Sequence, residues 1–184
     1  MSGGILRVNE IQKGDGTAFP IGKVLQVKST TKTDTFGATL AGNAKTDITG
    51  LSVSITPSST SSKILIFYSV QGVSGQANRF VNFGLVLRRD SSDIILGDTA
   101  GSRQRTTNFL TVRANANDGN TGGTVSYNYL DTPSSTSSLT YKVALQNISN
   151  SSTTYQINRT FSDADNNNYR PRGTSSITVM EIGA

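Results

Sequence analysis

Acidic side chains are the first candidates for chemistry in this sequence, because it contains no histidine and no cysteine. Asp90 and Asp93 form one close pair, and Asp163 and Asp165 form another. General acid–base catalysis by two carboxylates needs an enclosed cleft that tunes their pKa values. The sequence shows no sign of such a cleft around either pair. We therefore predict that the protein is not an enzyme and has no catalytic residues.

The stretch 163–168 begins like a calcium-binding loop, with aspartates at its first and third positions. Such a loop needs a glycine at its sixth position and a bidentate glutamate at its twelfth. The sequence has Asn168 and Thr174 at those places instead. A turn rich in Asp and Asn accounts for the stretch better. We predict no metal site and no cofactor, and the sequence alone leaves cation binding at 163–168 open.

Small polar residues take the place of charged ones in the composition. Of the 184 residues, 24 are Ser, 24 are Thr, 15 are Asn and 18 are Gly, whereas charged residues make up 16%. Without Cys there are no disulfides or thiolate metal sites, and without His the usual catalytic base is missing. No apolar run approaches the roughly 18 residues that cross a bilayer. The composition therefore disfavours a disulfide scaffold, membrane insertion and most familiar enzymes.

The formal net charge is +5, and the basic residues occur as scattered pairs. A nucleic-acid-binding surface concentrates its Lys and Arg residues, so we predict no nucleic-acid partner. Basic side chains at a surface most often form ion pairs or extend into solvent. The alternative is contact with an anionic glycan or a partner protein. The candidates for that surface contact are Arg103, Arg105, Arg170 and Arg172.

Alternation of apolar and polar residues with period two predicts half-buried β-strands. It is clearest at 51–56 and at 139–146, where every odd position is apolar. Other short runs rich in Thr, Val, Ile, Tyr and Phe are separated by clusters of Gly, Asn, Ser and Pro. Together they give about ten strands. This pattern predicts an all-β fold, an antiparallel two-sheet sandwich of the jelly-roll type.

Two of the predicted strands, in the runs 63–70 and 79–89, are apolar on both faces. A strand that is apolar on both faces must be covered on both. A chain this short has little spare material for a third layer, so a neighbouring subunit is the expected cover. The predicted subunit interface consists of Ile64, Ile66, Tyr68, Phe80 and Val86.

One heptapeptide occurs twice in the chain. The sequence TPSSTSS stands at 56–62 and again at 132–138, each time between two predicted strands. Proline suits a turn, and the hydroxyl groups can bond to the nearby backbone. The repeat predicts two equivalent loops at one end of a pseudo-symmetric sandwich. The alternative is a common polar loop that was used twice.

The first 22 residues differ in character from the rest. Five glycines and a proline interrupt a few apolar residues there, which are too few for an independent core. We predict an N-terminal attachment arm at 1–22 and a β-sandwich head at 23–184. The attachment residues of the arm are Ile5, Leu6, Val8, Ile11 and Phe19.

Several sequence blocks resemble small structural proteins of tailed bacteriophages, especially marine and cyanobacterial ones. The blocks extend from about residue 22 to the C-terminus, and the region 1–21 matches less clearly. They are GKVLQV (22–27), KTDTF (32–36), DITGLSVSITP (47–57), SSKIL (61–65), LDTP (130–133), TYKV (140–143), INRT (157–160) and SSITVMEI (175–182).

The resemblance implies a virion protein with a trimeric β-sandwich head, of the jelly-roll type seen in tumour-necrosis-factor-like and complement-like (C1q-like) domains. Our leading hypothesis is a non-enzymatic homotrimer of a tail fibre or adhesin, anchored by its N-terminal arm. Its loops would contact a host cell-surface glycan or protein, and avidity would multiply weak contacts. The main alternative is a capsid decoration protein that clamps shell subunits. A glycan-degrading enzyme is less favoured, because the chain has no repeat of 20–50 residues.

Overall fold

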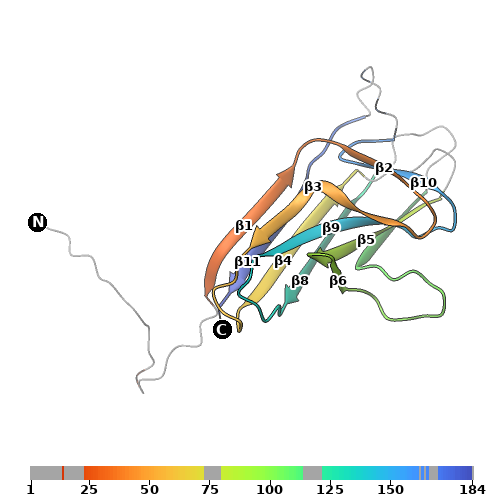
Figure 1. Cartoon of the computed structure of the whole chain (residues 1–184). Coiled ribbons are helices and arrows are strands. Elements are labelled where there is room, and N and C mark those ends of the chain that lie inside the picture. The colour runs from red at the N-terminus through yellow and green to blue at the C-terminus, as the bar shows by residue number, and fades with distance from the viewer. Residues whose placement is uncertain are drawn as a thin grey trace, which may run out of the picture.

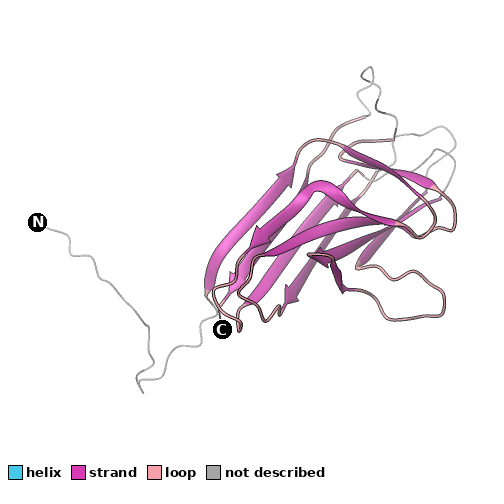
Figure 2. Cartoon of the chain, viewed as in Figure 1, coloured by secondary structure: helices cyan, strands magenta, loops and turns pink. Residues whose placement is uncertain are grey.

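The structure, a computed structural model, describes residue 14 and residues 23–72, 80–113, 122–161, 163, 165 and 170–183, apart from the side chains of 80–82 and 112–113. Within this part of the chain there are eleven β-strands and no helix (Figure 2). The strands are β1 (Val24–Lys32), β2 (Phe36–Leu40), β3 (Lys45–Ile55), β4 (Lys63–Gln71), β5 (Phe80–Arg89), β6 (Ser92–Ile95), β7 (Asn108–Arg113), β8 (Thr124–Asp131), β9 (Leu139–Asn147), β10 (Thr153–Ile157) and β11 (Ser175–Ile182). All their pairings are antiparallel, so the predicted all-β antiparallel fold is confirmed.

The strands pair as one long hairpin that is folded over on itself. β1 pairs with β11, β2 with β10, β3 with β9, β4 with β8 and β5 with β7. Each pair lies inside the previous one in sequence, and this nesting is the pairing of a jelly roll. This long two-stranded hairpin, which we call the ribbon, folds into two sheets (Figure 1). One is a four-stranded sheet of order β1-β11-β4-β8, and the other has the order β3-β9-β5-β6, with β7 also paired with β5. The pair β2–β10 forms a separate two-stranded sheet.

The core lies between the sheets and follows the period-two pattern of the sequence. In β4, every second side chain is buried, from Ile64 to Val70. Tyr141 and Tyr155 are the largest side chains that are fully buried. Burying a large apolar side chain stabilises a fold by roughly 1.5–3 kcal/mol. The alternating residues therefore hold the two layers together without cross-links.

The two copies of TPSSTSS lie at the same end of the sandwich, as predicted. The loop 56–62 leads from β3 to β4, and the loop 132–138 leads from β8 to β9. Ile55 pairs with Leu139 before one corner, and Ile64 pairs with Asp131 after it. Both strands of the ribbon thus cross from one sheet to the other at the same place. The repeated loops are the two sides of one corner.

Candidate interaction surfaces

The outer face of the four-stranded sheet carries a row of apolar residues. Neighbouring strands place Val27 beside Met180, Met180 beside Leu65, and Leu65 beside Leu130. The row therefore crosses all four strands at one level. Val27 is 51% exposed and Leu130 is 45% exposed. Phe67, two residues along β4 on the same face, is 42% exposed.

This sheet holds most of the exposed large apolar side chains among the described residues. The described part of the chain has six of them, and Phe109 is the one that lies outside this sheet. Scattered exposed apolar residues are normal on a protein surface, but a contiguous patch marks an interaction site. We call the outer face of this sheet, centred on Val27, Leu65, Phe67, Leu130 and Met180, the apolar face.

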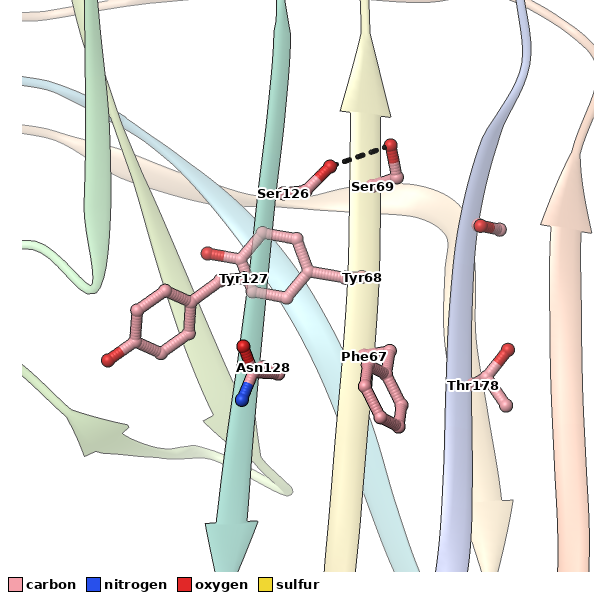
Figure 3. A pocket seen from close by; sticks show the side chains of 8 residues that line it. Phe67, Tyr68, Ser69, Ser126, Tyr127, Asn128 and Thr178 are labelled. Atoms are coloured by element: carbon pink, nitrogen blue, oxygen red, sulfur yellow. Dashed lines mark hydrogen bonds between the residues drawn. The ribbon is translucent and has the colours of Figure 1, made fainter.

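A shallow hollow lies on the apolar face beside Phe67, with a volume of about 320 Å³. Figure 3 shows Phe67 standing between Asn128 on β8 and Thr178 on β11. Small hydroxyl side chains make up most of the remaining rim, and Ser126 donates a hydrogen bond to Ser69 at 3.1 Å. The face therefore presents a projecting phenyl ring next to a recess lined by short side chains.

The outer face of the second sheet is charged. Asp47 accepts hydrogen bonds from Arg88 at 2.7 Å and from Lys142 at 2.9 Å. Asp93 pairs with Arg88 and with Lys45. Partial burial raises the pKa of Asp47, but the hydrogen bonds from Lys142 and Arg88 outweigh it and lower the pKa below its usual value. These charges neutralise one another within the chain.

Part of the loop 96–107 contacts the outer face of the same charged sheet. Gln146 on β9 donates a hydrogen bond to Gln104 in the loop at 3.1 Å. The side chain of Thr106 occupies the space above Gly84, where a Cβ atom would collide with it. Val86 lies on this same face of β5 and is fully buried. The loop thus covers the outer face of this sheet at Gly84 and Gln146.

The structure corrects the predicted subunit interface. Ile64, Ile66 and Tyr68 belong to the core between the two sheets of a single chain. The inner face of β4 is the one with more apolar residues, and the prediction assigned that face to a neighbour. Val86 does lie on an outer face, but its burial is complete within one chain. The side chain of Phe80 lies outside the described residues.

The candidate surface that the sequence analysis missed is the opposite face of β4. Leu65 and Phe67 are visible in the alternation, but the sequence did not say which of two apolar faces turns outward. The number of large apolar residues on each face of β4 could have identified the inner face. That face carries four of them, and the outer face carries two. The partners Met180 and Leu130 join them only through strand pairing.

The four arginines predicted for surface contact do not form one patch. Arg103 and Arg105 are exposed in the loop 96–107, where the guanidinium of Arg105 donates to the Gly97 carbonyl at 2.6 Å. Arg172 donates to Asp163 at 2.8 Å, so the ion-pair interpretation applies to it. Arg170 also makes an interaction.

A second hollow, of about 460 Å³, opens beside Arg103. Its polar rim includes Asn43 and Asn150. Asn43 has a positive φ of 65°, a conformation that asparagine tolerates better than most residues. A hollow of this kind can donate and accept hydrogen bonds, but the described residues place no aromatic ring beside it.

The end that carries the repeated loops is held by two buried carboxylates. Glu181 accepts hydrogen bonds from the backbone and hydroxyl of Ser58, at 2.7 and 2.6 Å, and from Gln26 at 2.6 Å. Burial raises the pKa of Glu181, but these hydrogen bonds outweigh it and lower the pKa to about 2. Asp131 accepts hydrogen bonds from Arg89 and Tyr141, both at 2.7 Å. Hydrogen bonds to a buried carboxyl group thus hold each side of the corner.

The remaining predicted sites fall largely outside the described residues. The attachment residues Ile5, Leu6, Val8, Ile11 and Phe19 all do. In the stretch 163–168 only Asp163 and Asp165 are described, and Asp163 pairs with Arg159 and Arg172. No group of three or more acidic side chains that could hold a metal ion occurs among the described residues. Nor does the described part of the chain contain a helix long and apolar enough to cross a membrane.

Comparison with known proteins gives no family. No family model matches the chain, and no curated protein matches it. The chain is similar in fold to a solved structure of the infectious bursal disease virus Gx strain, with 12% identity over 96% of this chain and 44% of that one, at a TM-score of 0.43. It is also similar to the VP2 subviral particle of that virus, with 10% identity over 97% of this chain and 46% of that one, at a TM-score of 0.39. The chain spans less than half the length of these matches, and likenesses at this level carry no inference about function.

Proposed function

We propose that the chain is a non-enzymatic structural protein of a tailed-phage virion, a homotrimer anchored through its N-terminal arm. The sequence blocks that resemble phage structural proteins support this proposal, and so does the jelly-roll fold that the resemblance implied. Within that framework we favour the head of a tail fibre or adhesin. Its partners would be other virion proteins at one end and a host cell-surface glycan or protein at the other.

The proposal depends on the fact that the jelly roll has two different ends. Nested pairing brings both ends of the ribbon to one place, because Val24 at the start of β1 pairs with Ile182 at the end of β11. The two corner loops lie at this same end (Figure 1). An arm at 1–22 would leave the head there. Attachment and contact can then use opposite ends of one molecule, and we call the end away from the arm the distal end.

The distal end offers the surface for host contact. Arg172 lies there, next to Gly173, whose N–H donates to the Asn158 carbonyl at 3.0 Å. We propose that Arg170 and Arg172 contribute to binding an anionic group on the host, since the side chain of Arg172 stays 62% exposed while it pairs with Asp163. Replacing both by Ala should weaken binding of the full chain to host cells several-fold. Lys63→Ala, which removes a charge at the arm end, is the control and should leave binding unchanged.

The place of the protein in the virion is tested on intact particles. Gold-labelled antibody against the chain should mark the tail tips if it is a fibre or adhesin. Labelling spread over the shell would instead support the alternative, a capsid decoration protein. Particles without any label would overturn the virion assignment itself. The alternative is retained because a flat apolar face can pack on a shell as well as on a sister subunit.

A further inference from the structure

We propose that the apolar face is the surface through which copies of this chain associate, and that its occupant is the equivalent face of a second copy. The inference deepens the proposed homotrimer by naming its contact, and it rests on that proposal only for the number of copies. A dimer would cover the face with one neighbour, and a trimer would cover it with parts of two.

The contrast between the two sheet surfaces singles out this face. The outer face of the second sheet places two aspartates among three basic residues and lies partly under the loop 96–107. On the apolar face, Lys63 at one end is the only charged residue at an outward position of β4, β8 and β11. In a chain with 29 charged residues, that distribution leaves one face depleted of charge. Depletion of charge at the centre is the compositional mark of an interface.

The size of the face suits a stable contact. Four strands about 4.8 Å apart and eight residues long, at about 3.3 Å per residue, cover a flat area of roughly 500 Å². The side chains that project from it raise the accessible area toward the roughly 800 Å² per partner that specific interfaces bury. Two sheets can pack face to face at about 10 Å when their side chains interdigitate. The face therefore needs no additional element to form an interface.

The shape of the apolar face, a projecting side chain beside a recess, is complementary to the same face of a second copy. Phe67 projects beside the hollow of about 320 Å³ that its neighbours on β8 and β11 line (Figure 3). In an association between equivalent surfaces, each copy offers both the projecting group and the recess that receives it. A large aromatic side chain in a recess of the partner is also the usual form of an energetic hot spot. Phe67 is thus the residue on which the contact should depend most.

The native mass tests the inference through paired substitutions. Light scattering of the full chain should give a multiple of 19.5 kDa. Phe67→Lys and Leu130→Lys should each reduce the mass to that of one chain while circular dichroism still shows a folded β protein. Phe109→Lys is the matched control, because Phe109 is 63% exposed but lies on the other sheet, and it should keep the native mass. An oligomer whose mass survives both substitutions on the face would overturn the inference and leave the virion assignment standing.

A unique cysteine distinguishes a second copy from the N-terminal arm as the occupant. The sequence has no cysteine, so Leu130→Cys gives the full chain a single thiol on the face. If a second copy covers it, the thiol should be protected from a maleimide at high protein concentration and should react at least ten-fold faster on dilution. Protection that persists on dilution while light scattering gives the mass of one chain would instead assign the face to the chain's own arm. A thiol that reacts fully at every concentration would show the face to be bare.

Discussion

Two buried carboxylates at the arm end show how single residues fix this fold. Glu181 and Asp131 are almost fully buried, and hydrogen-bond donors surround each carboxyl group. A buried charge without such partners would cost far more than any packing gain. Both groups stand where the ribbon crosses between the sheets. At the level of single residues, the hydrogen bonds of polar side chains fix the position of the corner, and the apolar side chains pack it.

The depressed pKa of Glu181 predicts a loss of stability in acid. The folded-state pKa of about 2 lies below the ordinary value of 4.5, so ionised Glu181 stabilises the fold above about pH 4.5. That contribution should disappear as the pH falls from about 4.5 through 2. Urea unfolding of the native chain and of Glu181→Gln should therefore differ most at neutral pH and converge near pH 2. An equal difference at both pH values would contradict the assignment.

Two tyrosine hydroxyl groups in the core differ in their hydrogen bonding. Tyr141 donates to Asp131 at 2.7 Å, whereas the hydroxyl of Tyr68 is buried without a hydrogen-bond partner among the described residues. Removing a satisfied buried hydroxyl costs about 1–2 kcal/mol, and removing an unsatisfied one costs nothing or is stabilising. Tyr141→Phe should lower the free energy of unfolding by that amount, and Tyr68→Phe should leave it unchanged or raise it. Equal losses for the two variants in chemical denaturation would disprove the distinction.

The loop 96–107 illustrates how an element changes the role of a sheet face. Thr106 in the loop lies over Gly84, and Gln104 accepts a hydrogen bond from Gln146. The loop is fastened at its ends as well, since the hydroxyl of Thr107 donates to the Ile95 carbonyl at 2.6 Å and accepts from the Leu87 N–H at 2.8 Å. The loop therefore covers part of the charged outer face, and the apolar face is the one that we propose for a partner.

A methyl group at position 84 should loosen this loop. The Cβ of Gly84→Ala would collide with Thr106 and lie 3.1 Å from the Ile148 side chain, so the loop must shift. Overpacking of this kind costs about 1–3 kcal/mol, which thermal unfolding would detect. Thr106→Ser removes the obstructing methyl group and should restore part of the loss. Gly97→Ala, whose nearest atom would be 3.9 Å away, is the neutral control.

Nested pairing governs the molecule as a whole. The first and last strands meet, the two corner loops meet, and the chain acquires an arm end and a distal end. The two outer faces then differ sharply, one neutral and apolar, the other ion-paired and partly covered. This asymmetry is the basis on which we propose the apolar face for association.

Association through the apolar face predicts a melting temperature that depends on concentration. Mass action stabilises a folded oligomer as the protein concentration rises, because the unfolded chain does not associate in the same way. Calorimetry of the native chain should therefore show a Tm that increases between micromolar and near-millimolar concentrations. Phe67→Lys should show no such increase. A Tm of the native chain that is constant over this range would contradict association in solution.

Much of the architecture was predictable from local patterns. Period-two alternation at 51–56 and 139–146 became β3 and β9, and the repeated heptapeptide became the two sides of one corner. These predictions succeeded because alternation and turn residues act within a few residues of each other. The absence of His and Cys likewise narrowed the possible chemistry before any fold was known.

Only the tertiary structure decided which apolar face of β4 points inward. Ile64 and Leu65 are neighbours with similar side chains, and one is fully buried while the other meets Leu130 and Met180 on the surface. The choice depends on the partner strands and on a loop that covers the other sheet, all distant in sequence. Alternation shows that the strand has two distinct faces, but which face is buried depends on how all the strands pack together. For that reason the sequence determined the sandwich, and the tertiary structure determined which face remains for a partner.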